Sequence, residues 1–172
     1  MADRPTPNGR EKVMREQDFI VSKTDLRGVI TYGNRTFIEF SGYSEGDLLG
    51  APHNIIRHPD MPRAVFHLLW ETIQAGREIF AYVLNMSRDG SHYWVMANVM
   101  VNRDSSGKAI GYYSVRRRPK PEAVKVIAGL YKAMREKERQ IGGEEGMKAA
   151  RRILEGVCEE KGAGYDEVIL GL

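Results

Sequence analysis

The sequence contains a single cysteine, Cys158, and no apolar stretch approaching the length of a membrane-spanning helix. One cysteine excludes an internal disulfide, and the polar N-terminus lacks the apolar segment of a secretory signal peptide. A membrane span needs roughly 20 apolar residues in succession. These absences predict a cytoplasmic protein that does not insert into the membrane and is recruited to the inner membrane only through a partner.

A strong charge of either sign is also absent. Lys and Arg number 26 against 23 Asp and Glu, so the net charge is only +3. This excess is too small to form the basic face that binds nucleic acid, and we expect no nucleic-acid partner. The 172 residues, 42% of them hydrophobic, suit one folded domain with appended segments.

Recognisable catalytic and metal-binding motifs are missing as well. The chain has neither a glycine-rich phosphate loop nor a Ser/His/Asp or Cys/His set that could be assembled with any specificity. His53 and His58 lie five residues apart in a non-helical segment, and no cysteine or carboxylate pair completes a tetrahedral metal site. We therefore expect neither enzymatic activity nor a bound metal ion.

The pattern along the chain predicts an α+β domain over residues 17–118, preceded by a flexible leader over residues 1–16. β-prone runs separated by turn residues predict strands over residues 19–21, 28–33, 78–87, 91–102 and 108–117. Asn34 stands where a helix cap is expected, and apolar residues at helical spacing predict a helix over residues 62–74. This element order predicts one sheet with its helices on one face.

A helical extension is predicted over residues 119–172. Apolar stripes at helical spacing occupy residues 121–140 and 147–157, and the tail over residues 165–172 is apolar enough to dock. The stripes either fold back onto the sheet or meet a helix of another protein, and a homodimer is one form of the second alternative.

The segment 52–62 holds an arginine, two histidines, an amide and a carboxylate between rigid prolines, directly before the predicted helix. Fixed polar groups beside an apolar helix are typical of the rim of a ligand pocket. Arg57 could pair with a phosphate in fork geometry. In the alternative reading, Asp60 caps the helix, Pro62 lies in its first turn and Arg57 is solvated.

Residues 18–118 resemble the PAS domain family, and within it the FAD-binding PAS sensors of bacterial aerotaxis and energy-taxis receptors. The matching stretches are Thr24-Asp25-Leu26, Gly28-Val29-Ile30-Thr31, Phe40-Ser41-Gly42-Tyr43, Pro52-His53-Asn54, Arg57-His58-Pro59-Asp60-Met61-Pro62, Trp70, and Gly90 with Tyr93-Trp94-Val95. The resemblance implies a five-stranded antiparallel sheet with short helices on one face. It also implies a free-standing PAS partner of a two-protein energy-taxis system, in which a membrane chemoreceptor or another signalling protein carries the output.

In this family FAD lies between the helices and the sheet. The resemblance implies cofactor-binding roles for Asn34, His53, Asn54, Arg57, His58, Asp60, Trp70 and Asn85. The Asn85 amide can both donate and accept hydrogen bonds, so it can respond to the protonation of a flavin nitrogen. The expected function is a redox sensor that signals the oxidation state of its flavin.

The sequence leaves two other functions open. One is a haem-based gas sensor with His53, His58 or His67 as the axial ligand, and the other is a cofactor-free interaction module. Trp70 is in step with Phe66 and Ile73, so it serves either the core or the cofactor.

Other residues have simpler expectations. Arg116, Arg117 and Arg118 are expected to be solvated or to contact a partner. Photoreceptor PAS domains of the light-oxygen-voltage type need a cysteine next to the flavin, whereas Cys158 falls in the helical extension. We therefore expect no blue-light adduct chemistry.

Overall fold

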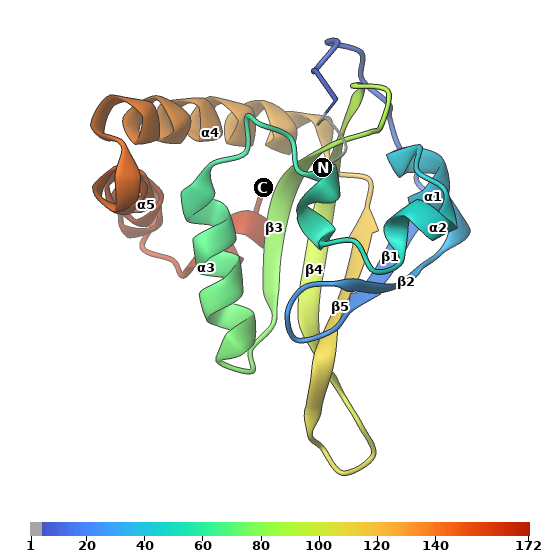
Figure 1. Ribbon diagram of the computed structural model, residues 1–172. Helices are drawn as coiled ribbons and strands as arrows, with labels where there is room; N and C mark the ends of the chain where they lie inside the picture. The colour runs from blue at the N-terminus through green and yellow to red at the C-terminus, as the bar shows by residue number, and fades with distance from the viewer. Residues whose placement is uncertain (1–4) are drawn as a thin grey trace.

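Five strands form one antiparallel sheet in the computed structural model, which describes residues 5–172 (Figure 1). The strand order across the sheet is β2-β1-β5-β4-β3, so the first and last strands lie side by side at its centre. The strands are β1 (Phe19–Thr24), β2 (Ile30–Gly33), β3 (Ile79–Met86), β4 (His92–Arg103) and β5 (Ala109–Arg117). The five predicted strands and the α+β fold class are confirmed.

Short helices follow β2, and one longer helix leads into β3. They are α1 (Arg35–Ser41), α2 (Glu45–Leu48), the 3-10 helix η1 (His53–Ile56) and α3 (Arg63–Gln74). The Asn34 side chain accepts a 3.0 Å hydrogen bond from the Phe37 N–H and so caps α1, as the sequence predicts. Figure 1 shows α3 running alongside β3.

The N-terminus of α3 is capped from a distant part of the chain. Pro62 occupies the cap position and offers no side-chain acceptor. Instead, the carboxylate of Glu138 accepts hydrogen bonds from the backbone N–H groups of Arg63 at 3.1 Å and Ala64 at 2.9 Å. The alternative in which Asp60 caps this helix is therefore wrong, because Glu138 takes that role.

The helical extension folds back onto the domain. It consists of α4 (Pro121–Ile141), α5 (Gly143–Lys161) and α6 (Tyr165–Leu170). Buried side chains of α4, α5 and α6 belong to the same hydrophobic core as those of β3 and β4. Of the two alternatives for these stripes, packing within the chain is the one observed. No helix among residues 5–172 has the length and apolar character needed to span a membrane.

The outer edge of β3 is covered over most of its length. Backbone groups of this strand bond to Asp166, whose Oδ1 accepts from the Phe80 N–H at 3.3 Å, and to the Tyr131 hydroxyl, which donates to a carbonyl. Farther along, the sulfur of Met61 lies 3.2 Å from the Leu84 nitrogen. Unpaired edge strands invite association with other chains, so this cover protects the sheet.

The leader prediction is wrong for residues 8–14. The Lys12 N–H donates to the His92 carbonyl at 2.8 Å and the His92 N–H donates to the Arg10 carbonyl at 2.9 Å, so this segment pairs with the start of β4. Met14 is only 2% exposed. A single buried apolar residue produces no periodicity, which is why the pattern did not reveal the contact. Residues 1–4 of the predicted leader lie outside the described part of the chain.

Candidate ligand-binding cavity

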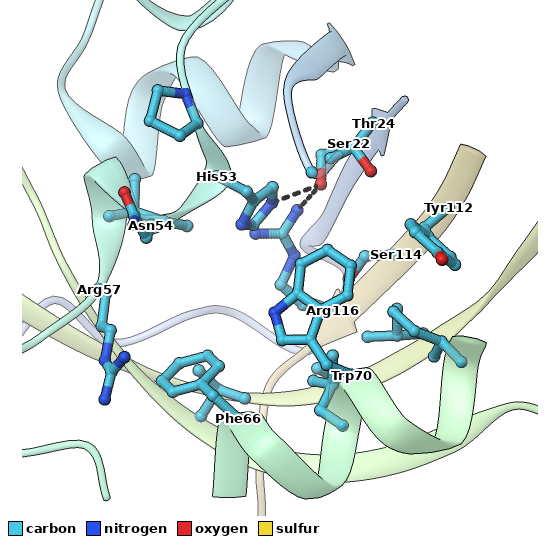
Figure 2. A pocket seen from close by; sticks show the side chains of 18 of the residues that line it. Ser22, Thr24, His53, Asn54, Arg57, Phe66, Trp70, Tyr112, Ser114 and Arg116 are labelled. Carbon is cyan, nitrogen blue, oxygen red and sulfur yellow. Dashed lines mark hydrogen bonds between the residues drawn. The ribbon is translucent and has the colours of Figure 1, made fainter. Parts of the chain in front are cut away.

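A cavity of about 320 Å³ lies between α3, η1 and the inner face of the sheet (Figure 2). Strands β1, β3, β4 and β5 contribute to its floor. The wall formed by α3 is apolar and aromatic, with the side chains of Phe66, Leu69, Trp70 and Ile73. Its volume is at the lower end of the range for small-molecule sites, and an apolar lining with few polar groups is typical of them.

Three polar residues meet on the floor of the cavity. The Ser22 hydroxyl lies 3.0 Å from Nε2 of His53 and accepts a hydrogen bond from Nη2 of Arg116, as the dashed lines in Figure 2 show. On its other side, the guanidinium lies 4.8 Å from the centre of the Phe37 ring. Ser22 and Arg116 share this face of the sheet because adjacent strands β1 and β5 bring them there.

Arg116 is buried without a balancing charge. Its side chain is 2% exposed, and its Nε and Nη1 atoms have no hydrogen-bond partner among residues 5–172. No carboxylate in that part of the chain forms an ion pair with it. Burial lowers the pKa of Arg116 to about 10, so the group stays protonated at neutral pH. A buried charge of this kind is costly unless something pairs with it.

His53 is neutral at the same floor. Burial, and then the charge of Arg116, lower the pKa of His53 to about 3. Its ring stacks on Phe37 with the two centres 5.9 Å apart. The floor therefore carries one fixed positive charge beside a neutral imidazole.

At the end of the cavity formed by β3, an amide is left unsatisfied. Asn85 is 3% exposed, and its Nδ2 has no partner among the described residues. Arg57 bridges to Asn85 through the backbone, and its guanidinium donates to the Met61 carbonyl at 3.2 Å. The same guanidinium lies 4.3 Å from the centre of the Phe66 ring. Arg57 thus stands at the cavity margin, held over an aromatic side chain.

Trp70 packs against the turn between β1 and β2. A Cβ atom at Gly28 would lie 2.9 Å from Cη2 of Trp70, and the φ angle of Gly28 is +80°, so only glycine fits there without strain. Trp70 also meets Tyr112 edge to face, with ring centres 5.5 Å apart. Trp70 thus packs on its neighbours and also lines the cavity, and its role in binding a cofactor stays a prediction.

Of the eight residues named from the resemblance, five converge on this cavity: His53, Asn54, Arg57, Trp70 and Asn85. The other three do not line it. Asn34 is occupied as the cap of α1. His58 is 4% exposed and its Nδ1 accepts from the Asp60 N–H at 3.0 Å, while the Asp60 carboxylate is largely exposed.

Sequence reasoning missed Arg116. Arg117 and Arg118 are exposed, as expected, but Arg116 points into the cavity. The usable signal is strand alternation, because Arg116 is in phase with Tyr112 and Ser114, which also line the cavity.

Residues 30–116 match the family described as PAS fold. The chain belongs to this family. The PAS fold expected from the resemblance is thereby confirmed, and the cavity lies within the matched segment except for its β1 side.

Relatives and solved structures extend this result. The chain is 39% identical over 134 residues to the aerotaxis receptor of Escherichia coli (strain K12), which covers 78% of this PAS chain and 26% of the receptor. It is 26% identical over 105 residues to a nitrogen fixation regulatory protein of Klebsiella pneumoniae, covering 61% of this chain and 21% of the relative. The chain thus spans about a quarter or less of the length of these relatives.

Among solved structures, the dark structure of the blue-light photoreceptor Aureochrome1 LOV superimposes with a TM-score of 0.55 and 28% identity. The superposition covers 66% of this chain and 83% of the photoreceptor chain. The cavity of the PAS domain described here has no cysteine in its lining, because Cys158 lies on α5.

Proposed function

We propose that this PAS protein is a redox sensor that binds FAD in the cavity between α3 and the sheet. The observation that carries the proposal is the cavity itself, where an aromatic helix wall faces a floor of buried hydrogen-bond donors. Five of the residues that the resemblance implies for FAD binding line it. Similarity to an aerotaxis receptor and to a light-oxygen-voltage domain supports a flavin as the ligand.

The cavity suits the flat ring system of a flavin. Such a ring has apolar faces, which Phe66 and Trp70 can contact, and a polar edge of carbonyl and nitrogen atoms, which needs buried donors. Asn85 offers an unpaired amide for that edge. The diphosphate would lie at the margin near Arg57, whose guanidinium suits phosphate oxygens. A bound flavin supplies reversible uptake of electrons.

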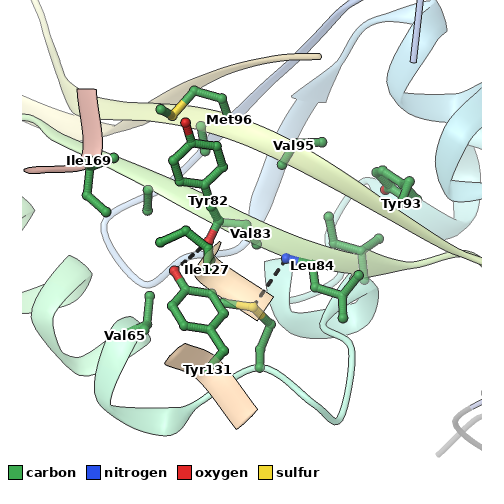
Figure 3. Close-up of a cluster of buried hydrophobic side chains, with 14 of the residues drawn as sticks. Val65, Tyr82, Val83, Leu84, Tyr93, Val95, Met96, Ile127, Tyr131 and Ile169 are labelled. Atoms are coloured by element: carbon green, nitrogen blue, oxygen red, sulfur yellow. Dashed lines mark hydrogen bonds between the residues drawn. The ribbon is translucent and has the colours of Figure 1, made fainter. Parts of the chain in front are cut away.

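The residues of β3 provide a route from the ligand to the rest of the chain. Asn85 can donate to or accept from a flavin nitrogen by turning its amide, so its orientation can follow the redox state. The same strand is held from outside by α4, where the Tyr131 hydroxyl donates to the Tyr82 carbonyl at 2.7 Å. Figure 3 shows Tyr131 packed with Ile127 below Tyr82. Signalling requires that the two redox states favour two protein conformations unequally.

The proposed partner is a membrane chemoreceptor or another signalling protein of the chemotaxis type, which recruits the sensor from the cytoplasm to the inner membrane. Similarity to an aerotaxis receptor and to a nitrogen fixation regulatory protein supports sensing rather than catalysis. A homodimer that presents two sensors to one receptor is compatible with this role.

An absorption spectrum of the purified full chain, before and after dithionite, tests the proposal. We expect flavin bands that bleach on reduction, and mass spectrometry of the released cofactor should identify FAD. A colourless protein that takes up no FAD on incubation would overturn the proposal. A Soret band would instead assign a haem, for which His53 and His67 are the histidines that line the cavity.

A further inference from the structure

We propose that Arg116 recognises the flavin by donating hydrogen bonds to the carbonyl edge of its ring at the floor of the cavity. This inference rests on the proposed FAD function, and it names Arg116 as the residue that recognises the flavin ring. Nothing in the resemblance assigns Arg116, which the sequence suggested to be solvated.

Two hydrogen-bond donors of the buried Arg116 side chain have no partner among the described residues. Buried polar groups in native proteins almost always have partners, and each exception calls for an explanation. Arg116 has two such unpaired atoms, Nε and Nη1, and the residue is only 2% exposed. Within residues 5–172, the Ser22 hydroxyl is the one acceptor that the Arg116 side chain reaches. The remaining acceptors must come from what enters the cavity.

The position of Arg116 favours the ring over the diphosphate of FAD. The guanidinium is enclosed between the Phe37 ring and the strands, and its neighbour His53 is neutral. A diphosphate carries several charges and needs more than one cation. Arg57 and Arg27 are the arginines toward the exposed margin of the cavity, so the phosphates are better served there. The carbonyl oxygens of a flavin ring need only a few hydrogen-bond donors, and the unpaired Nε and Nη1 atoms of Arg116 on the cavity floor can supply them.

The proposal predicts opposite effects on binding and on stability. In the flavin-free protein, Arg116 is an uncompensated buried charge, which costs stability. Replacing it with methionine keeps a long apolar side chain and removes the charge. The melting temperature of the flavin-free protein should therefore stay the same or rise, while flavin binding weakens. If Arg116 instead served only to hold Ser22, His53 and Phe37 together, the same change would lower the melting temperature.

The test compares Arg116→Met with Arg117→Met in the full chain stripped of its cofactor. Arg117 is the adjacent residue, exposed and on the opposite face of β5, so it controls for the loss of charge. Riboflavin and FAD are the probes, titrated by fluorescence quenching. Riboflavin has the ring without any phosphate.

We expect Arg116→Met to weaken binding of both probes by a similar factor, about ten- to hundredfold, which corresponds to losing hydrogen bonds from a charged donor. Arg117→Met should leave both affinities within about twofold of the wild type. A second variant, Arg116→Gln, keeps a donor without the charge and should bind riboflavin with intermediate affinity; it also replaces Arg116→Met if that variant does not fold.

Three results would overturn the inference. They are unchanged riboflavin binding in both Arg116 variants, weaker binding of FAD alone, which would place Arg116 at the phosphates, and a lower melting temperature of the flavin-free variants. A wild-type protein that binds neither riboflavin nor FAD would defeat the proposed function itself, so the two failures are separable.

Discussion

Replacing Glu138 with alanine should destabilise α3, although Glu138 lies on α4. The carboxylate of Glu138 is the acceptor for two N–H groups at the start of α3, from Arg63 and Ala64, and its residue is only 6% exposed. Pro62 at the cap position supplies no substitute. Because α3 forms the apolar wall of the cavity, loosening its first turn should also weaken flavin binding.

The magnitude follows from three overlapping contributions. Losing a side-chain cap costs about 0.5–2 kcal/mol, losing a carboxylate at a helix N-terminus costs about 0.3–1 kcal/mol, and burying an N–H group without a partner costs about 1–3 kcal/mol. Since they describe the same two hydrogen bonds, we expect a total of about 2–3 kcal/mol. For a chain of this size that lowers the melting temperature by about 4–12 °C. Glu138→Gln keeps one acceptor and should lose about half as much.

Thermal unfolding and amide hydrogen exchange would measure this effect. Glu138→Ala should unfold at lower temperature and should exchange the amide protons of Arg63 and Ala64 faster than the wild type. Glu136→Ala is the matched control, because Glu136 is exposed on the same helix. Unchanged melting of Glu138→Ala, together with slow exchange at both amides, would refute the assignment of Glu138 as the cap.

Three further predictions concern the cavity. Arg57→Ala should reduce FAD occupancy after purification by about tenfold, with little change in the melting temperature of the flavin-free protein. Arg118→Ala should keep the occupancy of the wild type, and full occupancy in Arg57→Ala would contradict the phosphate role. The pKa of His53 is about 3 in the folded protein, against roughly 6.5 in the unfolded chain. Between these two pH values the folded state binds fewer protons than the unfolded state. The free energy of unfolding therefore falls as the pH drops below about 6.5, by up to about 1.4 kcal/mol per pH unit. His53→Gln should flatten that dependence in urea unfolding, and the same slope in both proteins would count against a neutral imidazole in the folded state. Since Cys158 lies away from the cavity, blue light should produce no reversible loss of flavin absorption, and a light-induced adduct spectrum would disprove this.

Local patterns predicted the elements that depend on neighbouring residues. The strands, the Asn34 cap and the helix over residues 62–74 follow from β-propensity, cap chemistry and apolar spacing within short windows. The cap of α3 could not be predicted in this way, because Glu138 lies 75 residues from Arg63 in the sequence. Only the packing of α4 brings the two together.

The candidate site was predicted in part for a similar reason. The proline-rich segment placed His53, Asn54 and Arg57 at a pocket rim, and all three line the cavity. Arg116 was missed because a run of three arginines at a strand end usually indicates solvent exposure. Strand alternation with Tyr112 and Ser114 indicates the face on which Arg116 lies, but its hydrogen-bond partner Ser22 comes from the neighbouring strand, which no local window contains.

The covered edge of β3 affects where this chain can be truncated and how a partner can bind to it. A fragment ending at residue 118 would lose the side chains of Tyr131 and Asp166 and expose backbone groups that would then be free to pair with a second copy. We expect such a fragment to self-associate, so the sequence boundary before α4 is a poor place to truncate. For the same reason, any protein that recruits β3 by strand addition must first displace α4 and α6, which makes these helices an intramolecular competitor for that surface.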